Sequence, residues 1–323
     1  MPDAVPSEVL LAFGMQDAEV TPIEQGLVNR HWRLDLGDRR YVLRRYHPRR
    51  TGEAIAWEQW LVDFAAKLGW PVAKPVASGD GSTLVEHGGW YCAVAPFLEG
   101  TPFAGTSVTA YRRQGEALAE LHDNLSDLEG PQRPGFGPTW DLDMWVGLWG
   151  ATGFDAIVDE LDRVRPELAS LIRTERAKNV RELIDGGVDD LPLLPIHGDF
   201  QRFNLLWEGE RITGIVDFDF CRRDVLIADL APLLSPFMPL EIEEAAALFD
   251  GYQSVRPLSQ VERTLLLPMA RAGLLRWVAT LVAEWGGVGA VPDGIERTMT
   301  VRWPAFEQAA PAFEALLSAS NRT

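Results

Sequence analysis

The chain contains 323 residues, of which 46% are hydrophobic and 24% are charged. These proportions are typical of a folded globular protein and exclude a disordered one, and the length favours two lobes or domains over a single small core. The formal net charge of −17 argues against nucleic acid as a partner, because a negatively charged surface repels a phosphate backbone. It is compatible with a cationic small-molecule substrate.

Cysteine usage and apolar segments bear on the compartment. The chain has 2 cysteines, Cys92 and Cys221, far apart in the sequence, so neither a disulfide framework nor a metal-ligand spacing is expected. The N-terminus lacks a basic region followed by a long apolar run, and no stretch approaches about eighteen consecutive apolar residues. We therefore expect a cytoplasmic protein with no signal peptide, no membrane span and no obligate protein partner.

The first part of the chain is expected to form mainly strands. One helix is predicted over residues 52–68, where apolar residues recur at helical spacing and Glu58 lies on the apolar side. In the strand before it, Val42 and Arg44 share one face, because side chains alternate along a strand. The alternative is that Arg44 and Arg45 both lie on a solvated edge. Runs of β-prone residues bounded by turns predict strands at residues 18–24, 31–36, 39–46, 74–78, 82–86 and 90–97.

The rest of the chain is expected to be mainly helical. His122 lies on an apolar helix face, which favours packing or a buried hydrogen bond over catalysis. Ser259 and Glu262 form a capping box, which predicts the start of a long helix. A kink is expected at Pro166 and a break at Pro304, since proline removes a backbone donor. Helices are predicted at about residues 107–125, 154–184, 224–234, 240–255, 259–285 and from 292 onward.

Residues 130–150 are rich in proline, glycine and tryptophan, which indicates either a surface crossing or a lid over a substrate. Asp141 and Asp143 are flanked by Trp140 and Trp145. This arrangement could bind an amine by charge and by cation–π contact, or the tryptophans could be ordinary core residues. The sequence leaves both readings open.

Residues 194–229 concentrate polar groups at the ends of apolar runs. One run ends in His197-Gly198-Asp199, Asn204 precedes a second run, and a third run at residues 212–216 ends on Asp217. Strands would bring Asp199, Asn204 and Asp217 to one place. A phosphate-transfer site needs a base for the attacking hydroxyl and oxygen ligands for magnesium. The alternative interpretation is that these are polar loop residues at strand ends.

The pattern HGDxxxxN, followed by a strand that ends in Asp, resembles the aminoglycoside phosphotransferase and choline kinase superfamily, the small-molecule branch of the protein-kinase-like fold. The segments VNRHWRL, YVLRRY and GYQSVRPLSQVE resemble type II homoserine kinases, diffusely and over most of the chain. The resemblance implies an α+β bilobal fold. A small, mainly antiparallel β lobe with one helix would occupy residues 1–97, a hinge 98–102, and a larger, mainly α-helical lobe 103–323.

The resemblance also implies roles for individual residues. Asp199 would be the catalytic base, and Asn204 and Asp217 would hold Mg²⁺. Arg44, where the family often has Lys, would bind ATP phosphates while Glu58 holds it in place. Further roles follow in the same way: Gly26 and Asn29 closing over phosphates, Val42 above the base, the Pro96 carbonyl and Leu98 N–H on adenine, Asp219 on metal or substrate, Asp141, Asp143 and Trp140 on substrate, and Asp229 and His197 in structural support.

The function implied is an ATP- and Mg²⁺-dependent kinase that phosphorylates a hydroxyl of a small cationic or amino-alcohol substrate. Homoserine or a similar amino alcohol is the first choice, an aminoglycoside or similar antibiotic the second, and an uncharged sugar the third. Two other classes remain open. One is a pseudokinase that binds nucleotide as a regulatory module, and the other, which lacks support from a glycine-rich loop, is a protein kinase.

Overall fold

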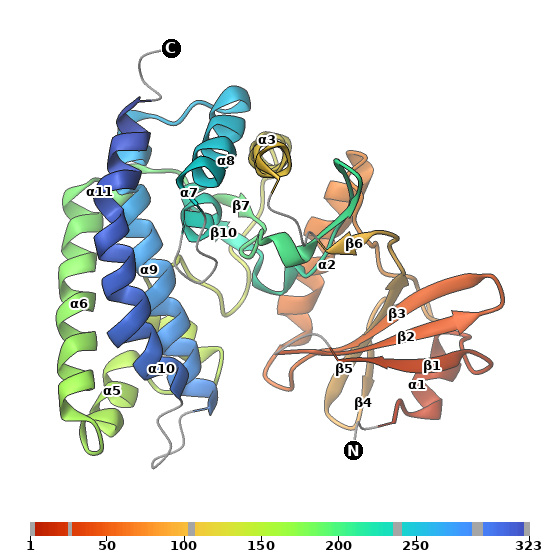
Figure 1. Ribbon diagram of the computed structural model, residues 1–323. Helices are drawn as coiled ribbons and strands as arrows, with labels where there is room; N and C mark the ends of the chain where they lie inside the picture. Colours follow the sequence, from red (N-terminus) through yellow and green to blue (C-terminus); the bar gives the residue numbers. More distant parts are fainter. Residues whose placement is uncertain (1–3, 25–27, 103–106, 235–240, 286–292, 320–323) are drawn as a thin grey trace. The chain divides into compact units, whose positions relative to one another are not determined.

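The computed structural model describes residues 4–24, 28–102, 107–234, 241–285 and 293–319 (Figure 1). These residues form two compact units. The first unit contains Met1–Phe103 and Phe203–Asp217, and the second contains Ala104–Arg202 and Phe218–Thr323. The chain therefore leaves the second unit after Arg202 and returns to it at Phe218. The expected hinge at residues 98–102 stays a prediction.

The first unit is built on an antiparallel sheet of 5 strands in the order β1-β2-β3-β5-β4. Its central strand β3 pairs Leu43 with Trp32 on β2 and with Val94 on β5. The expected hairpin and third strand are confirmed. The strands are β1 (Glu19–Ile23), β2 (Arg30–Leu36), β3 (Arg39–Arg45), β4 (Val85–His87) and β5 (Trp90–Pro96).

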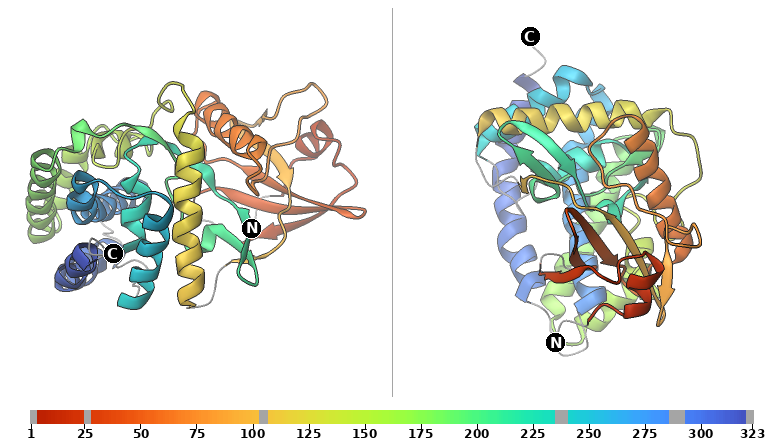
Figure 2. Two further views of the ribbon diagram at one scale, coloured as in Figure 1. Left: turned by 90° about the horizontal axis from the view of Figure 1, so that it is seen from above. Right: turned by 90° about the vertical axis from the view of Figure 1, so that its right-hand side faces the viewer.

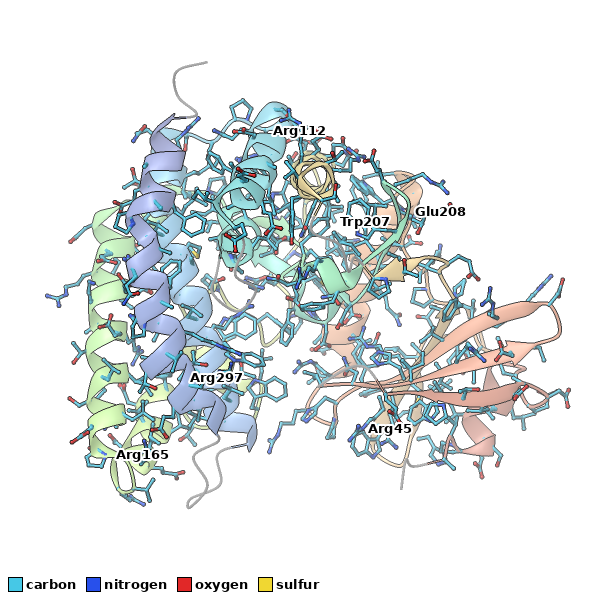
Figure 3. All side chains as sticks on the ribbon, viewed as in Figure 1. Arg45, Arg112, Arg165, Trp207, Glu208 and Arg297 are labelled. Atoms are coloured by element: carbon cyan, nitrogen blue, oxygen red, sulfur yellow. The ribbon has the colours of Figure 1, made fainter. Side chains whose placement is uncertain are left out.

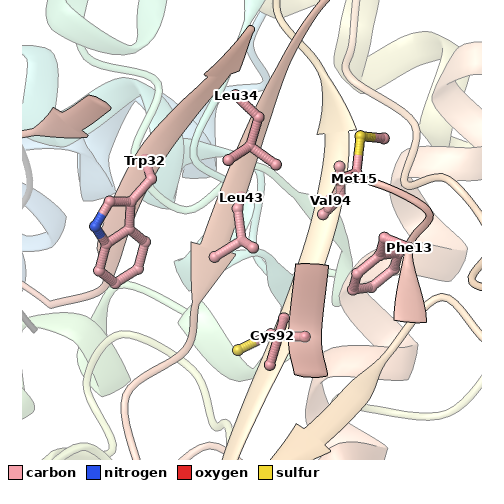
Figure 4. Packing of buried hydrophobic residues seen from close by; sticks show 8 residues of the cluster. Phe13, Met15, Trp32, Leu34, Leu43, Cys92 and Val94 are labelled. Atoms are coloured by element: carbon pink, nitrogen blue, oxygen red, sulfur yellow. The ribbon is translucent and has the colours of Figure 1, made fainter. Parts of the chain in front are cut away.

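The two faces of this sheet bury different side chains. One face packs with α1 (Ser7–Ala12) in an apolar cluster shown in Figure 4, which contains Val9, Phe13, Met15, Trp32, Leu34, Leu43, Cys92 and Val94. On the other face, Tyr46 and Ala93 pack against Ile55 of α2 (Gly52–Lys67), the helix predicted from the sequence. Alternation along β3 thus sends odd-numbered side chains toward α1 and even-numbered ones toward α2.

A smaller sheet completes the first unit. Its strands are β6 (Thr101–Pro102), β8 (Leu205–Glu208) and β9 (Arg211–Ile215), in the order β6-β8-β9. Ile215 also forms a parallel bridge with Val72, and its N–H donates to the carbonyl of Pro71 at 2.8 Å. These contacts attach the β8–β9 hairpin to the chain that follows α2.

The second unit is mainly helical, with one short pair of strands, β7 (Leu194–Ile196) and β10 (Arg222–Asp224). The long helix α9 packs against α6 and α11, which run beside it in Figures 1 and 2; Figure 2 shows the same set from two further sides. A second helix pair, α3 and α8, packs closely as well. The helices are α3 (Val108–Ser126), α4 (Leu142–Gly147), α5 (Phe154–Asp162), α6 (Pro166–Asp185), α7 (Ile227–Leu230), α8 (Ile242–Val255), α9 (Gln260–Trp285), α10 (Asp293–Arg297) and α11 (Trp303–Ala319).

Several differences between the expected and the observed strands and helices occur at prolines, and one occurs at a short strand. Residues 74–78 form no strand; Pro75 has no N–H to donate, and Val76 alone donates to Val94, at 2.8 Å. Pro166 begins a new helix instead of kinking one, since the first helical position needs no donor. The break expected at Pro304 is wrong: α10, a π-helical turn at Thr298–Arg302 and α11 follow one another without interruption, and Pro304 is the second residue of α11. Finally, Asp224 ends strand β10 and does not open a helix.

One described helix meets the length and composition of a membrane span. Residues Gln260–Ala283 of α9 have a mean hydropathy of 1.4 in their most apolar window. Of that window, 78% is buried inside the protein. Such burial is that of a core helix, and the capping box predicted for its start is present: Ser259 N–H donates to Glu262 at 2.8 Å and Glu262 N–H donates to Ser259 at 3.2 Å.

Candidate active site

Arg44 is held from two sides within the first unit. Its Nη1 donates to Glu58 Oε1 at 2.9 Å, so the ion pair predicted from the sequence is present. The Tyr46 hydroxyl donates to the same carboxylate oxygen at 3.3 Å, and the Arg44 guanidinium lies 4.6 Å from the Tyr46 ring centroid. The Arg44 and Glu58 side chains are 14% and 5% exposed. Because both side chains are largely buried, the ion pair with Glu58 restricts the orientation of the Arg44 guanidinium.

The neighbouring arginine has a different environment. Arg45, labelled in Figure 3, places its guanidinium 5.5 Å from the ring centroid of Trp32 and 4.5 Å from that of Trp90. Both contacts lie on the α1 side of the sheet, where cation–π stacking stabilises the strand. The alternative that both arginines lie on a solvated edge is therefore wrong. Arg44 remains the cation of the α2 face.

Asn204 and Asp217 lie at the open end of the β8–β9 hairpin. Leu205 pairs with Ile215, and the Val216 N–H donates to the Asn204 carbonyl at 2.9 Å. Asn204 is buried, whereas the Asp217 side chain is 40% exposed and accepts from Arg44 Nη2 at 3.2 Å. The structure thus connects Glu58, Arg44 and Asp217 in one chain of ion pairs.

Asp217 has an unusual backbone. Its φ is 62°, and among the described residues it is the non-glycine residue with a positive φ. Such strain persists where the surrounding structure over-determines it, and it is concentrated at functional sites. The observation supports a functional reason for Asp217.

The donor chemistry at this hairpin fits magnesium. Amide and carboxylate oxygens are hard ligands, and Mg²⁺ typically takes one or two carboxylates together with waters and substrate phosphates. Within the described ranges, no group of three or more His, Cys, Asp or Glu side chains could hold a metal by itself. A site made of Asn204 and Asp217 would therefore suit a metal that arrives with a phosphorylated ligand.

The other nucleotide-binding predictions fall at several places in the first unit. Pro96 ends β5, and Leu98 lies two residues beyond it. Val42 is half-buried on β3. Asn29 is buried and accepts from the His47 N–H at 2.9 Å, which gives it a structural contact as well. Gly26 lies outside the described residues.

In the second unit, Asp229 holds the backbone that leads to Asp199. Its two carboxylate oxygens accept from the N–H groups of His197 at 2.8 Å and Gly198 at 2.6 Å. His122 Nε2 lies 3.3 Å from the same carboxylate, and its Nδ1 lies 2.8 Å from the Tyr252 hydroxyl. These contacts are consistent with the structural role that the family resemblance implies for Asp229, and the buried hydrogen bond expected of His122 is present.

The charge of Asp229 is stabilised despite complete burial. Burial raises the pKa of the Asp229 carboxyl, but the hydrogen bond and charge of His122, with the charges of His197 and Arg222, more than offset it. The pKa of Asp229 is therefore lowered, and the group is ionised at neutral pH. An ionised carboxylate is the stronger acceptor for the two backbone donors.

His197 and Gly198 shape the turn before Asp199. The Asp199 N–H donates to His197 Nδ1 at 3.2 Å, and the His197 ring packs 4.4 Å from the Phe218 ring centroid. Gly198 has a φ of 84°, and a Cβ there would lie 2.0 Å from the Phe220 carbonyl oxygen. No other residue fits at Gly198, so its departure from the kinase H-R-D pattern has a steric reason.

Two buried arginines contact residues 219–224, which follow Asp217 in the chain, and the sequence did not predict these contacts. Arg133, 1% exposed, donates through Nη1 to the carbonyls of Asp219 at 2.8 Å and Cys221 at 3.0 Å. Arg222, fully buried, forms an ion pair with Asp224 at 2.7 Å. Arg133 lies in the proline- and glycine-rich segment that read as a surface crossing or lid. The one sequence feature that could have indicated this role is a charged residue in a segment otherwise rich in proline and glycine. A charged residue by itself does not predict a buried side chain.

The predicted substrate acids near α4 have structural contacts. Asp141 caps α4 by accepting from the Met144 N–H at 3.1 Å, and Asp143 accepts from the Phe154 N–H at 2.7 Å. Trp145 is buried and Trp140 is half-buried. Asp219 is 1% exposed. A substrate role for Asp141, Asp143, Trp140 and Asp219 stays a prediction.

Comparison with known proteins agrees with this geometry. A family model described as the phosphotransferase enzyme family matches residues 19–263. The homoserine kinase of Phenylobacterium zucineum is 30% identical over 268 residues, which cover 81% of this chain and 79% of the relative. The homoserine kinase of Methylocella silvestris is 30% identical over 271 residues, covering 82% and 80%.

Solved structures show the same fold at lower identity. A microcompartment-associated aminopropanol kinase has a TM-score of 0.73 at 18% identity and covers 96% of this chain and 97% of its own. An amicoumacin kinase in complex with AMP-PNP and Ca²⁺ has a TM-score of 0.74 at 14% identity, covering 95% and 93%. The expected kinase-like fold, with an antiparallel-sheet unit and a helical unit, is confirmed. The chain belongs to the phosphotransferase enzyme family and is a small-molecule phosphotransferase that acts on a hydroxyl group.

Proposed function

We propose that the protein is an ATP- and Mg²⁺-dependent kinase of a small amino alcohol, with L-homoserine as the first-choice acceptor. The observation that carries the proposal is Arg44, which joins Glu58 on α2 to Asp217 after β9. A buried carboxylate, a cation and a strained, exposed carboxylate in series are the parts that phosphoryl transfer requires of a nucleotide site. The acceptor is inferred from the relatives named homoserine kinase, which are 30% identical over most of their length.

In this proposal the first unit binds the nucleotide. Arg44 neutralises phosphate charge, and Glu58 fixes its direction at 2.9 Å. The Leu98 N–H and Pro96 carbonyl recognise the adenine edge, with Val42 against the ring. Asn204 and Asp217 hold Mg²⁺, which when bound offsets negative charge on the phosphate oxygens.

The second unit supplies the base. Asp199 accepts the hydrogen bond of the acceptor hydroxyl and then takes its proton. Because the transition state of phosphoryl transfer is loose, the main contribution of Asp199 is to orient the nucleophile. Asp229 and His197 keep the Asp199 backbone in place through the contacts at 2.8 Å and 3.2 Å.

The test compares two aspartate variants in an ADP-release assay with L-homoserine. Asp199→Asn and Asp217→Ala should each lower kcat by at least about 100-fold. Asp199→Asn should keep Mg²⁺-dependent nucleotide binding by calorimetry, because the variant leaves the phosphate-binding residues intact. Asp217→Ala should lose it, because the variant removes a metal ligand and a partner of Arg44.

A panel of acceptors accompanies this assay. L-homoserine, an aminoglycoside and a hexose are offered at equal concentration, with Asp199→Asn as the blank. Turnover that is highest with the aminoglycoside or the hexose would overturn the choice of acceptor. Near-full activity of either purified variant would overturn the assigned roles.

A further inference from the structure

Arg276 presents a cation beside the segment that carries Asp199. It lies on α9 and is half-buried. Its guanidinium carbon is 4.7 Å from the Trp145 ring centroid and 5.8 Å from the Phe220 ring centroid. Phe220 in turn touches Gly198, since its carbonyl oxygen lies 2.0 Å from where a Gly198 Cβ would stand. Arg276 is thus separated by one aromatic residue from the turn before Asp199.

The aromatic contacts are the ones that hold this guanidinium. No described residue forms a hydrogen bond or an ion pair with the Arg276 side chain, whereas Arg222, which also stacks on Trp145 at 4.9 Å, is bonded to Asp224 at 2.7 Å. Arg222 is therefore satisfied by the protein, and Arg276 is not satisfied within the described ranges. A guanidinium held in one direction by flat aromatic walls is prepared for a bidentate anion.

Charges around Arg276 point to the kind of anion. Burial and then the charge of Arg222 lower the pKa of Arg276, to about 10, although Asp199, Asp224 and Asp229 act in the opposite direction. The side chain is cationic at neutral pH. With these carboxylates nearby, a ligand that carried negative charge alone would be repelled. A zwitterion, which carries a carboxylate and an ammonium group, adds no net charge.

We propose that Arg276 binds the carboxylate of the phosphate acceptor, which makes the acceptor a hydroxy amino acid and Arg276 a residue that determines specificity. The inference rests on the proposed function and narrows it, since an amino alcohol without a carboxylate would not use this cation. Trp145 and Phe220 position the guanidinium. Asp199, on the same unit, then meets the hydroxyl of that acceptor.

The test uses two acceptors that differ by one group. L-homoserine carries the carboxylate, and 3-aminopropan-1-ol is the same chain with hydrogen in its place. Arg276→Gln should lower kcat/KM for L-homoserine by about 100-fold and change that for 3-aminopropan-1-ol by less than about 3-fold. Arg276→Lys keeps the positive charge but loses the bidentate guanidinium, so its kcat/KM for L-homoserine should fall between the values of the wild type and Arg276→Gln. The KM for ATP should stay unchanged.

Arg271→Gln is the matched control on the same helix. Arg271 bonds to Glu307 at 2.6 Å and to Glu182 at 3.1 Å, so its loss weakens packing without touching the proposed carboxylate site. Both acceptors should respond equally to it. An equal loss with both acceptors in Arg276→Gln would overturn the carboxylate assignment. A wild-type protein that turns over neither acceptor, but another alcohol, would instead overturn the proposed function.

Discussion

Arg44 and Arg45 are consecutive on β3, and the strand period places their cations in different surroundings. Arg44 lies on the α2 side, bonded to Glu58 and Asp217, and Arg45 lies between Trp32 and Trp90 on the α1 side. The sequence RRYVLRRY contains several arginines. Because side chains alternate along a strand and Leu43 is buried on the α1 side, Arg45 lies on that side and Arg44 on the other. The strand period therefore distinguishes the candidate nucleotide-binding arginine from the one that packs on tryptophans.

The pair provides a matched test at the scale of one residue. Arg44→Met should raise the KM for ATP by about 100-fold, because it removes the cation that faces the phosphates, and it should also lower stability, because it leaves the buried Glu58 carboxylate without its partner. Arg45→Met should lower stability by about 1 kcal/mol and leave the KM for ATP unchanged. Steady-state kinetics and thermal melting of both variants check this. Equal changes in KM for both variants would contradict the assignment.

Asp229 is the residue at which pH should act. Its pKa is lowered on folding, so it contributes stability that is present above its unfolded pKa of about 3.9 and is lost as the pH falls through the lower folded value. Asp229→Asn retains one acceptor oxygen for two backbone donors and should cost about 3 kcal/mol at pH 7. Its urea midpoint should also depend less on pH below about 4. A wild-type and a variant midpoint that fall in parallel with acid would contradict this account.

Much of the candidate site at this scale could be predicted from the sequence, because the positions of Asn204, Asp217 and Glu58 depend on spacing and on strand or helix periodicity. The contacts of Arg133 and Arg276 could not be predicted in this way. Their guanidinium groups contact carbonyls and aromatic rings that come from distant parts of the chain. Only tertiary packing brings a guanidinium to such partners, so no local pattern records it.

At the scale of elements, α3 and α8 pack with their backbones in contact. A Cβ on Gly115 would lie 2.0 Å from the Leu248 carbonyl oxygen, and one on Gly251 would lie 2.1 Å from that of Arg112. The helices therefore approach more closely than any other residue at these positions permits. The approach matters for the site, because Gln114 on α3 donates to the Phe200 carbonyl at 3.0 Å, next to Asp199.

Gly115→Ala should accordingly separate the two helices. The added methyl group meets backbone, which cannot rotate away, so we expect a loss of about 3 kcal/mol in the free energy of unfolding and a lower kcat. Gly147→Ala is the control, because a Cβ there meets nothing within 4 Å; it should be neutral or stabilise α4 slightly. Chemical denaturation measures both. A Gly115→Ala protein as stable as Gly147→Ala would show that the helices do not pack this closely.

The elements themselves were predicted best where periodicity is long. The helix over 52–68 and the capped helix from 259 are present, since each has several turns of consistent pattern and a start signal. The errors are at prolines and short runs. Residues 74–78 look like a strand by composition, but Pro75 removes a donor, and Arg222–Asp224 pairs with β7 through a contact that its three residues alone do not indicate.

At the scale of the whole molecule, the compact units separate the proposed tasks. Arg44, Glu58, Leu98, Asn204 and Asp217 all belong to the first unit, and Asp199, Asp229 and Arg276 belong to the second. The boundary falls within the sequence motif itself, after Arg202 and after Asp217. A continuous stretch of chain therefore supplies the proposed metal ligands to one unit and the proposed base to the other, and a division of the chain at a single position would place them together.

This division predicts how ligands change thermal stability. AMP-PNP with Mg²⁺, at about 100 times its Kd, should stabilise the unit that binds it by about 2.7 kcal/mol, or several degrees in its melting transition. Asp217→Ala should lose the part of this shift that depends on Mg²⁺, since it removes a ligand in the first unit. Arg276→Gln, in the second unit, should keep the full shift. Differential scanning calorimetry with and without Mg²⁺ distinguishes these cases. If Asp217→Ala kept the full Mg²⁺-dependent shift in melting temperature, Asp217 would not be a ligand of the metal.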